Sequence, residues 1–382
     1  MRVLANVAYK FRIYPNREQN TMFAKTFGCA RLVYNKFLNR RIEQYKEDKT
    51  TVSYTTCAKE MAEMKKSDDY SFLKEVDSIA LQQSLRHLDT AFCNFFKLPN
   101  NGFPRFKSKK DTKRSYSTVL VNGNISLTNN YLKLPKVGNV KVKQHRNIPL
   151  HYKLKSVTVS QNASGKYYAS ILFEYEKQAS NNVAYNFLGL DFSMHGLYKD
   201  SNGEEAEYPR YYRKKEARLK KEQRRLSLMV KGSKHRDKQR RKLAKVHEKV
   251  ANCRKDFLHK LSRKLANAYD CICIEDLNMK AMSQALNFGK SVCDNGWGMF
   301  TTFLKYKLEE MGKRLVNVFG MMSGDIDLIG RSIADAVIEP ARQKLVPHIK
   351  EAEAAAMANG AISSCIGGSG SCILSLDRKS VV

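Results

Sequence analysis

A forty-residue segment of almost one-signed charge constrains the fold most strongly. Residues 210–249 contain 18 lysines and arginines against 4 acidic residues. So many like charges cannot enter a core, because each would lose its hydration without gaining a partner. The segment has a mostly helical pattern, so we expect a long basic helix or a helical pair. Such a surface is either simply solvated or in contact with phosphates, and its length and single sign favour phosphate contact.

The excess of basic over acidic residues covers most of the chain and ends near residue 318. The 382 residues carry a formal net charge of +31. A charge of this size exceeds what solubility needs and indicates a polyanionic partner, most often nucleic acid. Residues 319–382 hold 6 basic and 7 acidic side chains, so the first 318 residues account for a net charge of +32. The balance of charge therefore changes sharply near residue 318.

Cysteine usage and hydropathy indicate a reducing compartment and no membrane anchor. The nine cysteines contain no C-x-x-C pair, so neither a disulfide framework nor a zinc ribbon is expected. Reduced cytosolic thiols are the default for such a pattern. Residues 1–15 lack the apolar core of a signal peptide, and no apolar run reaches transmembrane length. We therefore expect a cytoplasmic protein without a membrane partner.

Two periodicities divide the N-terminal half into strands and helices. Residues 3–13 alternate like a strand, and apolar stripes at helical spacing follow within residues 17–47 and 81–95. These stripes are expected to form a core. Residues 115–176 contain short alternating runs, with a hairpin expected around Ser164-Gly165. They should form a small β-barrel or sheet.

The loop GFPRFKSKKD, residues 102–111, interleaves aromatic and basic side chains. Phe103 and Phe106 alternate there with Arg105, Lys107, Lys109 and Lys110. The mixture suits a nucleic-acid backbone with stacked bases. It equally suits a solvated basic loop.

Two short apolar segments each contain a carboxylate where a strand gives way to a loop. They are LGLDFSMHGL, residues 188–197, with Asp191, and CICIEDLN, residues 271–278, with Glu275. A charge in a buried strand is costly unless it is paired or holds a metal. If the two strands are neighbours in one sheet, the carboxylates converge at one edge and can bind Mg²⁺. Two such ions, about 4 Å apart, would clamp the oxygens of a phosphodiester.

On spacing alone a purely structural alternative stays open. Asp191 can cap a turn, and Glu275, 84 residues later, can pair with a lysine. Asp276 is expected to be a turn or cap residue rather than a ligand.

From about residue 5 to residue 318 the chain resembles the TnpB/OrfB family of transposon-encoded proteins, the small relatives of type V CRISPR effector nucleases. The resemblance covers more than four fifths of the chain, in order. It rests on the stretches YKFRIYPNREQ, GCARLVYNKFL, AFCNFFK with GFPRFKSKK, LGLDFSMHGL, QRRLSLMVKGSKHRDKQRRKLAKVHEKVANCRKDFLHKLS, CICIEDLNMKAM and DNGWGMFTTFLKYKLEEMG.

The resemblance implies an RNA-guided DNA endonuclease of α/β multidomain fold. The implied parts are a β-barrel wedge domain at 1–14 and 107–180, a helical recognition domain of helix-turn-helix type at 15–106, and an incomplete RNase H-like RuvC domain at 183–318 with basic helices at 210–265. A separate resemblance, given below, assigns residues 319–382 to a truncated α+β kinase-like tail with junction sequence.

The resemblance also implies roles for individual residues. Asp191 matches the first RuvC aspartate and Glu275 matches the RuvC glutamate, both catalytic metal ligands, with Mg²⁺ as cofactor. Guide RNA and target DNA are the implied partners, in the prokaryotic cytoplasm and associated with the nucleoid. Nucleic-acid contacts are expected from Arg105, Lys107, Lys109, Lys110, Arg224, Arg225, Lys231, Lys234, Arg236, Lys238, Arg240 and Arg241.

The family pattern breaks after Val318. Members continue with a zinc module of two C-x-x-C pairs and a third catalytic aspartate in a D-R-x-x-N-A motif, and neither follows here. Residues 320–376 instead resemble the C-terminal portion of homoserine kinase, a member of the GHMP kinases. That resemblance rests on GDIDLIGRSIADAVIEP, LVPHIKEAEAAAMANGA and CIGGSGSC. We place the junction near residues 316–320.

The break decides between three functions. The kinases' ATP loop has no counterpart upstream, so a homoserine kinase activity is not expected and the isolated tail should be marginally ordered. Asp325, Asp327 and Asp377 are not expected to replace the third metal ligand, and no zinc is expected. Losing one of three ligands removes charge stabilisation from a two-metal transition state. We therefore expect a nuclease by descent that binds RNA and DNA and cleaves weakly or not at all; a binding module without any cleavage is the alternative.

Overall fold

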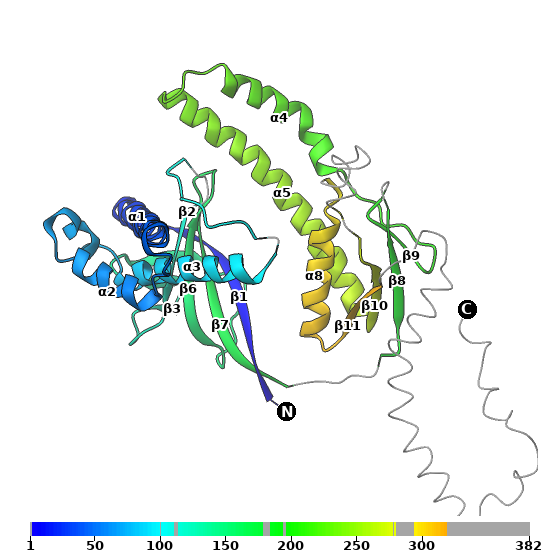
Figure 1. Cartoon of the computed structure of the whole chain (residues 1–382). Helices are drawn as coiled ribbons and strands as arrows, with labels where there is room; N and C mark the ends of the chain where they lie inside the picture. The colour runs from blue at the N-terminus through cyan, green and yellow to red at the C-terminus, as the bar shows by residue number, and fades with distance from the viewer. Residues whose placement is uncertain are drawn as a thin grey trace, which may run out of the picture. The chain divides into compact units, whose positions relative to one another are not determined.

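The computed structural model describes residues 2–99, 101–110, 114–178, 184–193, 196–277, 279 and 294–318. The chain divides into two compact units (Figure 1). The first unit comprises Met1–Asn181 and Tyr212–Cys253, and the second comprises Asn182–Tyr211 and Arg254–Val382. Each unit is considered by itself. The kinase-like tail, including Asp325, Asp327 and Asp377, lies outside the described residues.

The first unit is built on a seven-stranded antiparallel sheet with the order β2-β6-β7-β1-β5-β4-β3. Its long strands β1, β6 and β7 form the middle, and β6 and β7 are the predicted hairpin, with Gly165 in the left-handed region (φ +86°) at its turn. The strands are β1 (Arg2–Tyr14), β2 (Arg114–Val119), β3 (Ser126–Thr128), β4 (Tyr131–Leu134), β5 (Gly138–Lys143), β6 (Lys153–Gln161) and β7 (Tyr167–Gln178).

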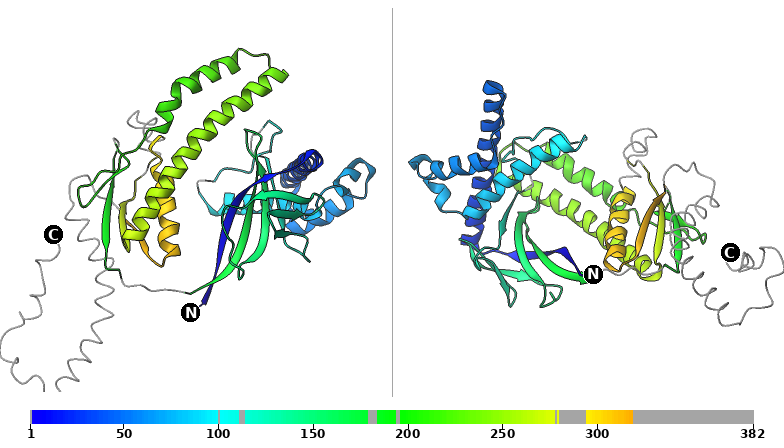
Figure 2. Two further views of the ribbon diagram at one scale, coloured as in Figure 1. Left: turned by 180° about the vertical axis from the view of Figure 1, so that it is seen from behind. Right: turned by 60° about the horizontal axis from the view of Figure 1, so that its bottom comes forward.

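Helices are inserted between β1 and β2, and they cover the sheet and build a second core (Figure 2). Helix α1 begins with a capping box between Asn16 and Gln19. One end of α1 places Phe23 and Phe27 in the core of the sheet, and the rest of the helix packs in a helical cluster around Leu85. The elements are α1 (Arg17–Asp48), α2 (Tyr54–Met64), the 3₁₀ helix η1 (Asp68–Lys74) and α3 (Ser78–Lys97).

The expected β-barrel does not close. Strands β2 and β3 stand at opposite edges of the described sheet and do not pair with each other. Closing a barrel requires the two edges to meet in register, and β3 offers only three residues for that pairing. Helices do the covering instead, because Phe23 and Phe27 from α1 and Ala80 from α3 fill the apolar face of the sheet.

The second unit contains a four-stranded sheet with the order β11-β10-β8-β9. The parallel strands are β8 (Phe187–Phe192), β10 (Cys271–Glu275) and β11 (Arg314–Val318), and the short β9 (Tyr198–Asp200) pairs antiparallel with β8. Helix α8 (Trp297–Glu310) and the end of α5 (Lys234–Ala268) pack on this sheet through Phe300 and Leu258. This is an α/β arrangement.

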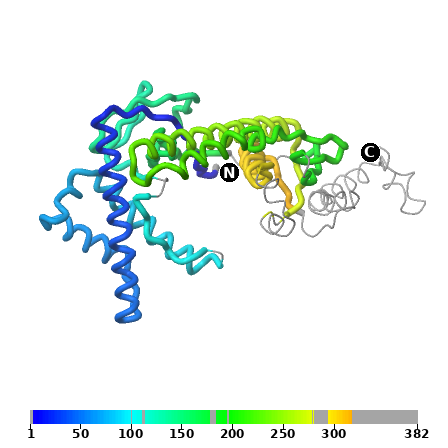
Figure 3. Tube along the Cα trace, turned by 90° about the horizontal axis from the view of Figure 1, so that it is seen from above, coloured from blue at the N-terminus to red at the C-terminus, as the bar shows by residue number. Residues whose placement is uncertain are grey.

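The basic segment forms a helical pair, one of the two arrangements expected from the sequence. Helix α4 (Tyr211–Ser227) and the first part of α5 lie side by side (Figure 3). A narrow apolar seam, formed by Leu219, Leu243 and Val246, joins them. At the same interface the buried Gln239 donates to the Glu222 carboxylate at 2.7 Å. Most basic side chains therefore stay on the outside.

Within the described residues we find no helix with the length and apolar character that a membrane crossing requires.

Candidate metal centre and nucleic-acid interface

The sheet of the second unit brings Asp191 and Glu275 to the same edge. Leu190 on β8 and Ile274 on β10 are direct partners in a parallel pairing. Asp191 and Glu275 are the next residues of the two strands, so both carboxylates lie at the carboxyl ends of neighbouring strands. On the far side of β10, Glu275 pairs with Val318 of β11. Carboxyl ends of parallel strands are where open α/β sheets usually bind ligands.

The two carboxylates are close enough to interact electrostatically. Burial, and then the negative charge of Asp191, raise the pKa of Glu275 above its ordinary value. Both effects penalise the ionised form of Glu275. A cation bound between the two groups would offset that penalty, so the donor set suits a hard divalent ion such as Mg²⁺.

Asp191 itself is exposed, although the sequence pattern suggested a buried charge. The strand residues before it, Leu188 and Leu190, are buried, but the strand leaves the core at Asp191. There it stands opposite Lys199 of β9, which is also exposed. The desolvation cost of the Asp191 carboxylate is therefore smaller than the apolar run around it suggested. Glu275, at intermediate exposure, carries more of the burial penalty.

Among the described residues, the carboxylates of Asp191 and Glu275 have no third metal-ligating side chain beside them. No group of three His, Cys, Asp or Glu side chains suited to a metal ion occurs in the described part of the chain. Asp276, expected to be a turn residue, is exposed and lies beyond the end of β10.

Asn295 organises the turn that follows Asp191, a role that no sequence pattern indicates. Its Nδ2 donates to the carbonyls of Ser193 at 3.0 Å and of Gly196 at 2.6 Å. Gly196 is required at this point, because a Cβ there would lie 2.6 Å from the carbonyl oxygen of Ala206. An amide 102 residues away in the sequence therefore holds the loop beside Asp191.

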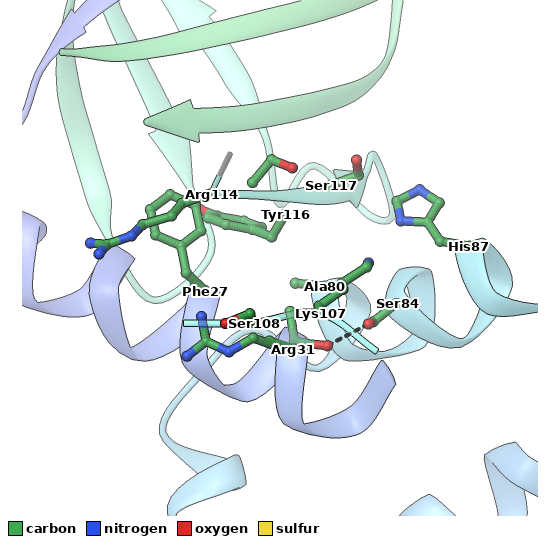
Figure 4. A pocket seen from close by; sticks show the side chains of 12 residues that line it. Phe27, Arg31, Ala80, Ser84, His87, Lys107, Ser108, Arg114, Tyr116 and Ser117 are labelled. Atoms are coloured by element: carbon green, nitrogen blue, oxygen red, sulfur yellow. Dashed lines mark hydrogen bonds between the residues drawn. The ribbon is translucent and has the colours of Figure 1, made fainter. Parts of the chain in front are cut away.

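The first basic cavity of the first unit encloses about 480 Å³ (Figure 4). Four cationic or titratable side chains from different elements line it, together with serines and the aromatic rings of Phe27 and Tyr116. They are Arg31, His87, Lys107 and Arg114. Among the described residues that line this cavity, none carries a carboxylate.

Of the predicted contact residues, Lys107 belongs to this cavity. Its ammonium lies 3.7 Å from the centre of the Tyr34 ring, and Asn35 binds its backbone through the N–H and the carbonyl. Burial lowers the pKa of Lys107. Burial, and then the charge of Lys107, lower the pKa of His87, so His87 is held neutral more strongly than a free histidine.

The second basic cavity of the first unit, of about 580 Å³, joins segments far apart in the sequence. Lys109 and Lys110 from the predicted loop face it together with Arg240 and Arg241 from α5. Arg114, which lines both cavities, and Lys245 complete the cationic part of the described lining. Neither Arg114 nor Lys245 was singled out from the sequence, although Lys245 belongs to the basic segment 210–249.

Glu248 on α5 links two of the elements that line the second basic cavity, α5 and the β6–β7 hairpin. Its carboxylate accepts hydrogen bonds from Asn162 at 2.9 Å and Tyr168 at 3.0 Å, and it pairs with Lys166 at 2.9 Å. All three partners belong to the β6–β7 hairpin or its turn. One of the few acidic side chains of the basic segment therefore holds α5 against the sheet.

The other predicted contact residues lie outside these cavities. Arg236 differs from the rest: it is half-buried, and its Nη1 donates to the carbonyls of Leu226 and Met229. The others are exposed, namely Arg105, Arg224, Arg225, Lys231, Lys234 and Lys238. Their contact with nucleic acid stays a prediction.

Comparison with known proteins defines the class. The IS605 OrfB family model, described as "Probable transposase", matches residues 170–286, and a helix-turn-helix domain model matches residues 1–50. A "Putative RNA-guided DNA endonuclease" of Streptomyces pristinaespiralis is 36% identical over 310 residues, which are 81% of this chain and 76% of that protein. The chain belongs to the TnpB/OrfB family of transposon-encoded proteins.

The tail and the fold have separate relatives. A model of the C-terminal part of GHMP kinases matches residues 316–381. Homoserine kinase of Chlorobium phaeobacteroides (strain BS1) is 38% identical over 76 residues, 20% of this chain and 24% of that enzyme. The solved structure "Cryo-EM structure of the Cas12f1-sgRNA-target DNA complex" superposes with a TM-score of 0.50 at 11% identity, covering 83% of this chain and 89% of that one. At that identity the likeness concerns the fold.

Proposed function

We propose that this chain is an RNA-guided DNA-binding protein, an endonuclease by descent, whose cleavage is weak or absent. The observation that carries the proposal is the pair of carboxylates, Asp191 and Glu275, at the carboxyl ends of β8 and β10. Family membership supports the ancestral reaction, since the Streptomyces relative carries the name of an RNA-guided endonuclease. The partners we propose are a guide RNA and its matching DNA, in the prokaryotic cytoplasm and associated with the nucleoid.

Nucleic-acid binding is supported by the chemistry of the first unit. The described lining of both basic cavities is cationic, and α4 and α5 add exposed lysines and arginines. Phosphate neutralisation by such side chains supplies most sequence-independent affinity. Specificity would come from base pairing with the guide, so the protein needs to recognise shape and backbone only.

Weak cleavage follows from an incomplete ligand set. Asp191 and Glu275 would hold Mg²⁺, and a bound Mg²⁺ would polarise a phosphoryl oxygen. Asn295 and Gly196 would keep the Asp191 loop in place. Beyond Val318 the sequence turns to the kinase-like tail, and no third RuvC aspartate follows in the family motif. An electrostatic site that lacks one of its charges loses much of its transition-state stabilisation.

Co-purification of RNA tests the binding proposal. The full chain is co-expressed with candidate guide RNA, and the RNA bound per protein is measured. We expect RNA in the wild type and a loss of roughly tenfold in Lys110→Glu/Arg241→Glu, because both charges line the second basic cavity. Lys133→Glu/Lys141→Glu is the matched control, since these exposed lysines line neither basic cavity. Wild-type protein free of RNA would overturn the proposal.

A further inference from the structure

The connection between α4 and α5 exposes two apolar side chains. Leu228 is 87% exposed and Val230 is 77% exposed, which places them among the four most exposed large apolar side chains of the described residues. Met229 between them has intermediate exposure. We call residues 228–231 the hairpin tip. Single exposed apolar residues are common on surfaces, but here two of them share one short turn.

Hydrogen bonds fix the hairpin tip in this conformation. The Arg236 guanidinium donates through Nη1 to the carbonyls of Leu226 at 2.7 Å and Met229 at 2.8 Å. The Ser233 N–H donates to the Val230 carbonyl at 3.3 Å. Gly232 takes the left-handed conformation (φ +87°) that lets the chain turn back into α5. The exposure of Leu228 and Val230 is therefore built into the turn.

At the end of α4, buried apolar side chains give way to exposed ones. Leu226 packs against the apolar seam between the helices, beside Leu219 and Leu243. Two residues later, Leu228 points its apolar surface to solvent. Leu228 and Val230 therefore lie outside the apolar seam, although Leu226 in the same segment packs against it.

Positive charge surrounds the hairpin tip on both sides. Arg224 and Arg225 precede it on α4, Lys231 belongs to it, and Lys234 opens α5; all four are exposed. No acidic residue occurs from position 224 to position 236. An apolar tip between two cationic arms matches a nucleic acid, whose apolar base stack lies between two phosphate backbones.

We propose that the hairpin tip is a wedge that inserts Leu228 and Val230 into the base stack of a nucleic acid gripped by α4 and α5. The inference rests on the proposed nucleic-acid binding. Apolar side chains placed between base steps unstack them, and neighbouring phosphate contacts compensate for the lost stacking. A second copy of the chain is a poor occupant, since the same cationic arms would meet and repel. A lipid surface is disfavoured because two side chains bury little apolar area.

Fluorescence of 2-aminopurine tests the wedge, because this base brightens when it is unstacked. The probe is a DNA duplex of alternating thymine and 2-aminopurine, so that insertion at any step reports. We expect wild-type full-length protein to raise the fluorescence roughly twofold. Leu228→Ser/Val230→Ser should lose that rise while its affinity for the duplex stays within about threefold, since phosphates supply most of the affinity. Leu150→Ser, at another fully exposed leucine, is the control and should behave like the wild type.

The outcomes separate the wedge from the proposed function. An unchanged rise in the double variant, or tight wild-type binding with no rise, would overturn the wedge and leave nucleic-acid binding intact. No wild-type binding to the duplex, together with no co-purified RNA, would overturn both. Binding to phosphatidylserine vesicles that the double variant loses, with no fluorescence rise on DNA, would reassign the tip to lipid and overturn the wedge. Thermal melting of the variants checks that these exposed substitutions leave the fold intact.

Discussion

Glu275 carries an unfavourable charge in the metal-free protein. Burial first and Asp191 second raise its pKa above the unfolded value, so the native state binds more protons than the unfolded state between the two values. Stability from this group is then present at low pH and is lost as pH rises through the raised pKa. Above the raised pKa the group is ionised in both states, and the cost of the native-state charge persists.

Replacing Glu275 by glutamine removes that cost. We expect Glu275→Gln to melt at a higher temperature than the wild type at pH 7 without divalent ions, and the difference to shrink as pH falls below the ordinary carboxyl range. Thermal melting from pH 4 to pH 8, in chelator, measures it. If the variant were less stable than the wild type at pH 7, the ionised Glu275 carboxylate would not be destabilising the native state, and this account of Glu275 would be contradicted.

Metal binding should depend on both carboxylates and on no neighbour. We expect Mg²⁺ to raise the melting temperature of the wild type, because ligands that bind only the native state stabilise it. Asp191→Ala and Glu275→Gln should abolish the shift. Asp276→Ala, next to Glu275 but beyond the end of β10, is the matched control and should keep it. Equal Mg²⁺ shifts in all four proteins would show that the ion binds elsewhere.

At the scale of elements, Gly196 stands where the chain passes close to the backbone of Ala206, just before β9. A Cβ on Gly196 would lie 2.6 Å from the backbone oxygen of Ala206, whereas a Cβ on Gly298 of α8 would meet nothing within 4 Å. We expect Gly196→Ala to destabilise the protein by about 2 kcal/mol or more. Gly298→Ala, in a helix, should stabilise it by about 0.5–1 kcal/mol. Chemical denaturation compares the two, and similar values would contradict the packing of this turn.

Single helices and hairpins could be predicted from nearby residues, but how they pack together could be predicted only in part. The β6–β7 hairpin, α1 and the α4–α5 pair follow from turn residues and periodicity, and the structure confirms them. Barrel closure was wrong, because it depends on whether the distant edges β2 and β3 meet. That the two apolar strands ending in acids are neighbours was a condition of the metal hypothesis, and the pairing of Leu190 with Ile274 meets that condition. The role of Asn295 was missed, since no local pattern marks an amide that acts 102 residues away.

At the scale of the whole molecule, the charge step coincides with the change of family. The family model of the kinase tail begins at residue 316, close to the junction expected at residues 316–320, and the net charge of +32 lies before it. The basic part carries every residue proposed to bind nucleic acid or metal. The acidic part begins where the nuclease family would supply its third aspartate. Loss of cleavage with retention of binding is the expected result of such a replacement.

Cleavage of a matched plasmid tests this account most directly. The full chain, purified with its guide RNA, is incubated with the plasmid and Mg²⁺ beside Asp191→Ala, and target binding is measured on the same samples. We predict that both proteins bind the matched target and that the wild type cuts no faster than Asp191→Ala. Robust cutting by the wild type that Asp191→Ala abolishes would contradict the account, because the two described carboxylates would then belong to a complete catalytic site.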